Sequence, residues 1–174
     1  KYSYYNRVLT YTTQIKFDNS IKDFNKCLEI DKDYAEAYVQ LGNVMRKINN
    51  NNEALEYYQK AINVDDDLSE PYLYIANIYK IRKQYGKAID NYNKSLEINP
   101  EQFEALNNRG NIYAEQQRYD LALSDYNTAV DINSSYAFAY NNRAFVYIKM
   151  NELDKAKTDL DKSYVLDPAN AYVF

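Results

Sequence analysis

Residues 103–136 read FEALNNRGNIYAEQQRYDLALSDYNTAVDINSSY, and the pattern of this stretch returns along the whole chain. Its twentieth residue, Ala122, has counterparts at multiples of 34 residues: Ala54, Ala88 and Ala156. Cut at this interval, the sequence falls into five blocks without insertion, residues 1–34, 35–68, 69–102, 103–136 and 137–170. A fixed period of this length is typical of a repeat array, in which each block packs mainly on its neighbours.

Other positions of the block keep the same kind of side chain from copy to copy. The fourth, eleventh and twenty-fourth are mostly aromatic, the eighth and twenty-seventh are mostly small, and Pro100 and Pro168 stand at the thirty-second. This pattern resembles the tetratricopeptide repeat (TPR), and the resemblance covers residues 1–170. Blocks two to four fit best, and block one departs most, with Val8, Ser20 and Lys32 at three of the family's positions.

Apolar residues recur within each block at helical spacing, which predicts two amphipathic helices at roughly positions 2–14 and 18–31. The resemblance implies an all-α TPR α-solenoid, a right-handed superhelix of antiparallel helix pairs. We therefore expect residues 1–174 to form a single array of about ten helices. Residues 171–174 would begin a further repeat or form a short C-terminal stub.

The turn inside each block is short and polar, and residues with capping side chains stand just after it. We expect these residues to be the N-caps of the second helices: Asp18, Asn52, Asp120 and Asp154. Gly42 and Gly110 fall inside the expected first helices, where glycine costs about 1 kcal/mol relative to alanine. This cost predicts that both glycines are required by close helix packing.

The composition limits the classes of function that the chain can have. The net charge is −4, so the chain has no basic footprint for nucleic acid. No apolar run has the length of a membrane span, so we expect no membrane insertion. The single cysteine, Cys27, takes a small-residue position and has no partner within the chain, which suits a reducing compartment and an intracellular, cytoplasmic location.

The sequence contains no histidine, the commonest general base and metal ligand. It also has no glycine-rich phosphate-binding loop. We therefore expect no enzyme active site, no cofactor and no metal site within these residues.

The resemblance implies a concave groove lined by positions 2, 5, 6, 9, 12 and 13 of the first helices, with Asn107 and Asn141 at position 5. Side-chain amides both donate and accept hydrogen bonds, so a row of them suits an extended peptide backbone. The cations would favour acidic segments. The candidate peptide-binding residues are Asn43, Asn77, Asn108, Asn111, Asn142, Arg46, Lys47, Lys80 and Lys149.

Two alternatives at these positions stay open, because an asparagine at position 9 can also steady neighbouring helices, and an Asn-rich composition can place asparagines by drift. The two-carboxylate clamp of TPR co-chaperones is excluded, since position 5 holds no lysine and position 2 holds glutamates. Arginines recur at position 7, as Arg7, Arg109 and Arg143. We expect their guanidinium groups to reach a carboxylate or carbonyl of the adjacent repeat rather than a ligand.

The leading hypothesis is a protein–protein interaction scaffold that binds a peptide or protein segment in the concave groove. One alternative is the substrate-recognition arm of a larger enzyme, such as an O-GlcNAc transferase-like glycosyltransferase, whose Asn-lined groove this one resembles. Another is a structural subunit of a multi-TPR assembly. Both ends of the array are aromatic and lack a polar cap, so we expect either a longer parent chain or end-to-end self-association.

Overall fold

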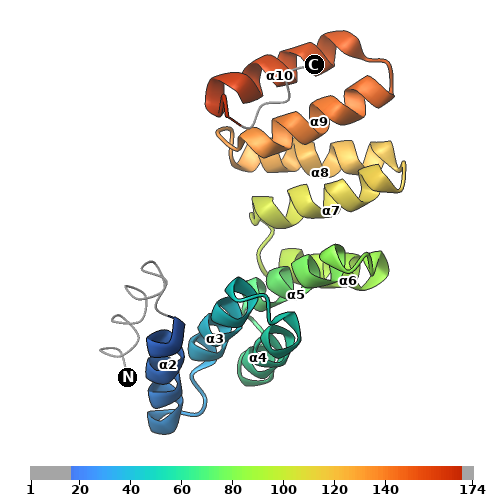
Figure 1. The fold of residues 1–174 in the computed structure, drawn as a ribbon. Coiled ribbons are helices and arrows are strands. Elements are labelled where there is room, and N and C mark those ends of the chain that lie inside the picture. The colour runs from blue at the N-terminus through green and yellow to red at the C-terminus, as the bar shows by residue number, and fades with distance from the viewer. Residues whose placement is uncertain (1–16, 170–174) are drawn as a thin grey trace. The chain divides into compact units, whose positions relative to one another are not determined.

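The computed structural model describes residues 17–169, and every helix or strand assigned within them is an α-helix (Figure 1). The helices of this span are α2 (Phe17–Ile30), α3 (Ala35–Lys47), α4 (Asn51–Val64), α5 (Ser69–Ile81), α6 (Tyr85–Ile98), α7 (Phe103–Glu115), α8 (Tyr119–Ile132), α9 (Ala137–Lys149) and α10 (Leu153–Leu166). The predicted all-α solenoid of helix pairs is confirmed. The first helix of block one and the stub at 171–174 lie outside the described residues.

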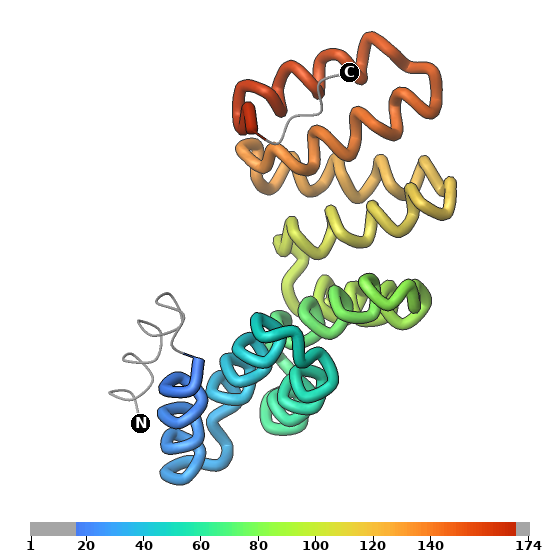
Figure 2. Tube along the Cα trace, viewed as in Figure 1, coloured from blue at the N-terminus to red at the C-terminus, as the bar shows by residue number. Residues whose placement is uncertain are grey.

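The chain divides into two compact units, residues 1–82 and 83–174 (Figure 2). In the first unit, α3 packs against α2 and α4, and α4 packs against α5. In the second, α7 packs against α6 and α8, α8 against α9, and α9 against α10. That the whole chain forms a single domain stays a prediction.

The described helices begin and end within one residue of the expected positions. Between the two helices, position 15 takes a left-handed backbone in four blocks, at Asn49 (φ 62°), Lys83 (φ 57°), Gln117 (φ 59°) and Asn151 (φ 62°). Asparagine tolerates this conformation better than most residues. The Asn49 N–H donates to the Arg46 carbonyl and the Asn50 N–H to the Met45 carbonyl, which is the Schellman pattern of a helix end.

The predicted N-caps of the second helices are wrong. Asp18, Asn52, Asp120 and Asp154 lie inside the first turn of their helices. The reason is the tight turn before them. Because of this turn the second helix already begins at position 17, and the residue at position 16 is its N-cap. In α4 this cap is Asn50, whose side chain accepts from the Glu53 N–H and donates to the Glu53 carboxylate at 2.7 Å.

The two helical glycines have the packing reason that the sequence predicted. A Cβ atom on Gly42 would lie 2.5 Å from Cε1 of Tyr58, and one on Gly110 would lie 2.8 Å from Cε1 of Tyr126. Both tyrosine rings are buried, and each comes from the second helix of the same block. Glycine at position 8 therefore lets a tyrosine at position 24 lie directly on the backbone of the first helix.

Enlarging Gly110 should destabilise the protein, because any side chain there displaces the Tyr126 ring. We expect Gly110→Leu to lower the free energy of unfolding by about 1–3 kcal/mol through overpacking. Gly86 is the matched control, since a Cβ atom there meets nothing within 4 Å. Gly86→Ala should instead stabilise by up to about 1 kcal/mol. Urea unfolding of both variants checks this pair, and equal effects would contradict the packing account.

Alkaline pH should destabilise the fold through its buried tyrosines. Burial raises the pKa of Tyr58 to about 12, against a smaller lowering by the nearby Arg46. Below about pH 10 the Tyr58 phenol is protonated in both the folded and the unfolded states, so its full contribution to the stability of the fold is present. Above that pH the unfolded chain ionises first, and stability falls as pH rises towards 12.

Urea unfolding at about pH 9 and about pH 11, with tyrosinate absorbance, measures this loss. Tyr58→Phe should show a shallower alkaline decline than the wild type. A decline of the same steepness in both proteins would mean that Tyr58 does not contribute.

Candidate functional site on the first helices

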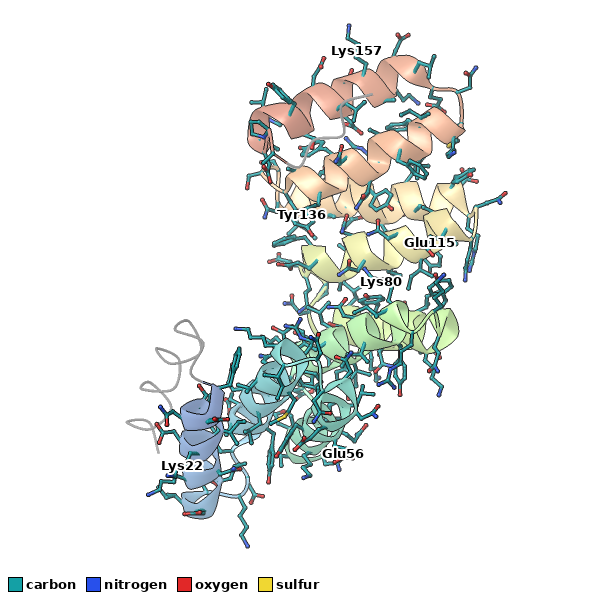
Figure 3. The ribbon with its side chains drawn as sticks, in the orientation of Figure 1. Lys22, Glu56, Lys80, Glu115, Tyr136 and Lys157 are labelled. Atoms are coloured by element: carbon teal, nitrogen blue, oxygen red, sulfur yellow. The ribbon has the colours of Figure 1, made fainter. Side chains whose placement is uncertain are left out.

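The residues of the predicted open face lie on α3 and α5 in the first unit and on α7 and α9 in the second. In the second unit, α7 and α9 contact each other and run in the same direction. Figure 3 shows Glu115, at the end of α7, and Tyr136, just before α9, at opposite ends of this pair. The first helices α7 and α9 thus lie side by side and present corresponding positions as neighbours.

Position 5 does not belong to this face, which corrects the predicted groove. Its described residues are buried, including Asn107 at 3% and Asn141 at 4% exposure. Asn107 contacts the next first helix, α9, from this buried position. There the Asn107 side-chain oxygen accepts a 2.9 Å hydrogen bond from Nδ2 of Asn142, which joins α7 to α9. Asn142, a predicted peptide contact, therefore uses a donor to hold two repeats together.

The asparagines at position 9 are held by the core tyrosines. The Tyr58 hydroxyl donates to Oδ1 of Asn43 at 2.8 Å, and the Tyr126 hydroxyl donates to Oδ1 of Asn111 at 2.7 Å. The alternative interpretation, that such asparagines steady neighbouring helices, is confirmed for these two. Each bond occupies the side-chain oxygen and fixes the amide plane. The Asn43 Nδ2 group donates a longer hydrogen bond, 3.5 Å, to Oε1 of Gln40.

A pocket of about 240 Å³ opens on this face of the first unit. It brings together three of the nine predicted residues with three others: Asn43, Arg46, Lys47, Gln40, Val44 and Tyr74. All six come from α3 or α5, which are both first helices. The pocket is therefore formed by the first helices of two successive blocks.

The Arg46 side chain is arranged over an aromatic platform in this pocket. Its guanidinium carbon lies 5.2 Å from the centre of the Tyr74 ring, a cation–π geometry. The Tyr74 ring in turn lies 5.4 Å from the Tyr58 ring, centre to centre. Among the described residues, Nε of Arg46 is buried and has no hydrogen-bond partner. The Arg46 side chain also hydrogen-bonds the Tyr58 side chain, so Nε is the part of the guanidinium group that lacks a hydrogen-bond partner within residues 17–169.

The remaining predicted residues lie on the first helices but outside this pocket. Asn77 and Lys80 are partly buried on α5, and Figure 3 shows Lys80 projecting from its last turn. Asn108 is partly buried on α7. Lys149 is exposed at the end of α9, with its ammonium 5.1 Å from the centre of the Phe145 ring. Amide side chains line α7. On α9, the half-exposed Phe145 stands at position 9, where α3, α5 and α7 each carry an asparagine.

Arg109 and Arg143 are structural, as predicted, although their carboxylate partner is not the expected one. Arg7, the third predicted arginine, lies outside the described residues. Nε of Arg109 donates to Oδ2 of Asp125 at 2.9 Å, and its Nη2 donates to Oδ1 at 2.7 Å. Asp125 belongs to the same repeat, and the preceding repeat supplies a side-chain amide oxygen from Asn93, 2.6 Å from Nη1.

Arg143 repeats this arrangement in the next block. It pairs side-on with Asp159 of its own repeat and donates to Asn127 of the preceding one. Each arginine therefore ties three helices together, and its donors are engaged within the protein.

Sequence reasoning did not select Gln40, Val44 and Tyr74 as site residues. Gln40 and Tyr74 both stand at position 6, one of the positions predicted to line the groove, so their position could have identified them. Nothing in the sequence marked Tyr74 as the platform for Arg46, because that contact joins two different blocks. Val44 stands at position 10, which the pattern assigns to the core.

Residues 17–169 show neither a metal-binding cluster nor a membrane-spanning helix. No three or more Cys, Asp or Glu side chains among them gather as a metal site requires. No helix among them combines the length and apolar character needed to cross a bilayer.

Models of TPR repeats match the chain throughout. One described as a TPR repeat matches residues 76–117 and 110–151. Two others, each described as a tetratricopeptide repeat, match residues 35–68 and 137–170 and residues 2–34. No curated protein matches the sequence.

Several solved structures share the fold at low sequence identity. MamA has a TM-score of 0.78 at 22% identity, over 93% of this chain and 95% of its own. PilF of Pseudomonas aeruginosa has a TM-score of 0.88 at 19% identity, over 97% and 77%. YrrB, a TPR protein with an unusual peptide-binding site, has a TM-score of 0.72 at 23% identity, over 96% and 86%.

These likenesses agree in fold, and the matched models together span almost the whole repeat pattern. The chain belongs to the tetratricopeptide repeat family.

Proposed function

We propose that this chain is a protein-interaction scaffold that binds an extended segment of a partner protein along the open face of its first helices. The observation that carries the proposal is the pocket between α3 and α5, which collects Asn43, Arg46 and Lys47 on that face. YrrB supports the general role, since it is a TPR protein with a peptide-binding site. Its site is not assumed to be the same as this one.

The hydrogen bonds of the asparagines indicate what kind of group the face would bind. Because Tyr58 and Tyr126 occupy the oxygens of Asn43 and Asn111, these amides offer mainly their N–H donors to a ligand. Donors fixed in direction suit the carbonyl groups of a peptide backbone. Such bonds do not depend on the side chains of the bound segment, so they would allow many different segments to bind and would not select among them.

The cations of the face would supply the selectivity. Arg46 and Lys47 lie together in a chain whose net charge is −4, so their pocket has the opposite charge to the molecule as a whole. A positive site in an acidic protein favours acidic segments and disfavours basic ones. We therefore expect the bound segments to be acidic and their binding to weaken with salt.

Selection of random peptides displayed on phage tests the proposal. The wild-type chain should enrich acidic peptides. Asn43→Asp combined with Asn111→Asp should bind the enriched peptides at least about tenfold more weakly, the loss expected when one hydrogen bond to a charged or oriented group is removed. Aspartate keeps an oxygen for each tyrosine hydroxyl, so the helix pairs stay joined.

Asn63→Asp is the matched control for this test. Asn63 lies on the second helix α4 and is exposed, and its side-chain oxygen accepts from Gln59, as an aspartate oxygen would. This variant makes the same chemical change away from the face and should keep the enriched peptides. The proposal fails if the wild type enriches no peptides, or if the paired variant binds them as well as Asn63→Asp does.

A further inference from the structure

We infer that the pocket between α3 and α5 is a carboxylate-binding site, with the Arg46 guanidinium as its main donor. The inference rests on the proposed function in one respect, that the carboxylate is carried by the bound protein segment. It goes further by assigning one chemical group of the ligand to one place on the face.

The lining of the pocket has the charge that such a group requires. Arg46 and Lys47 both line it, and no carboxylate does. Its other polar side chains are the amides of Gln40 and Asn43 and the ring of Tyr74. A volume of about 240 Å³ is below the range of roughly 300–1,000 Å³ found for sites that enclose a whole small molecule. The pocket therefore suits a single side chain or a chain end.

The other arginines of the first helices show what Arg46 lacks. Arg109 and Arg143 each hold a carboxylate side-on through Nε and Nη2, with distances of 2.7–2.9 Å. Arg46 stands on the same kind of helix with its Nε buried, yet no described residue accepts from that atom. A buried donor left unpaired costs free energy. A ligand carboxylate in the pocket would give the Arg46 guanidinium the acidic partner that Arg109 and Arg143 find within the protein.

The site is arranged before any ligand binds. Tyr74 supports the guanidinium plane, Tyr58 lies against Tyr74, and the Tyr58 hydroxyl is fixed by Asn43. This chain of contacts restricts the rotamers of Arg46, so less side-chain entropy is lost on binding. A planar guanidinium held in this way favours two parallel hydrogen bonds to one carboxylate.

Titration of the ¹⁵N-labelled chain with small probes, followed by NMR, tests the assignment. The side-chain probe is the α-amide of N-acetylglutamate, the chain-end probe is N-acetylalanine, and the neutral control is N-acetylglutamine amide. At least one carboxylate probe should shift the Arg46 Nε–Hε resonance saturably, with a dissociation constant on the order of millimolar for so few atoms. The neutral amide should not shift it.

The two carboxylate probes distinguish the source of the group. Binding of the glutamate probe alone indicates an acidic residue within the segment, and binding of N-acetylalanine alone indicates a C-terminus. Binding of both indicates a site that recognises the carboxylate group itself, whether it belongs to a side chain or to a chain end. Each of these results supports the inference.

Arg46→Lys keeps the positive charge but removes the guanidinium group, so the backbone amide shifts of the pocket residues should show the carboxylate probes binding about tenfold or more weakly. The same substitution at exposed Arg82, whose Nη2 bonds Asn52 at 2.7 Å, should leave the affinity unchanged. Unfolding curves of both variants check that the first unit stays folded. The inference is overturned if no probe shifts Arg46 saturably, if the neutral amide shifts it equally, or if Arg46→Lys keeps full affinity.

The two proposals can fail separately. If phage-selected peptides bind and lose affinity in the Asn43→Asp and Asn111→Asp variant but not in Arg46→Lys, the scaffold function stands and the carboxylate assignment is wrong. If the carboxylate probes bind but no peptide is enriched, the pocket stands and the scaffold function is wrong.

Discussion

The contact between a glycine on the first helix and a tyrosine on the second is the constraint on which the binding face depends. With no side chain at Gly42 or Gly110, the ring of Tyr58 or Tyr126 reaches across the first helix to the asparagine beside the glycine. One contact thus packs the two helices of a repeat and sets the orientation of a polar side chain on the outer face. Core packing and surface chemistry are therefore linked within the repeat.

The hydrogen bond from the tyrosine determines which groups of the asparagines are available to a ligand. An unattached amide would offer an acceptor and donors in any direction, whereas Asn43 and Asn111 present mainly donors in a fixed direction. The same tyrosines contribute to the neighbouring pocket, because Tyr58 supports Tyr74, which supports Arg46. Backbone binding by Asn43 and carboxylate binding by Arg46, which line the same pocket, would then act together on one acidic segment.

The period and the side-chain types predicted the helices to within one residue and the reason for Gly42 and Gly110, because both depend on contacts within a block. The N-caps were misplaced by two residues, since a left-handed turn consumes fewer residues than the pattern implied. The burial of Asn107 and the platform under Arg46 join different blocks, and periodicity alone does not define such contacts.

A double-mutant cycle between Tyr126 and Asn111 tests the central claim most directly. The free energy of unfolding is measured for the wild type, Tyr126→Phe, Asn111→Ala and the double variant. If the hydroxyl holds the asparagine, each single change should cost about 0.5–1.5 kcal/mol, and the double variant should cost less than their sum by a similar amount. Strict additivity would show that the two side chains do not depend on each other, and the account of the binding face would be contradicted.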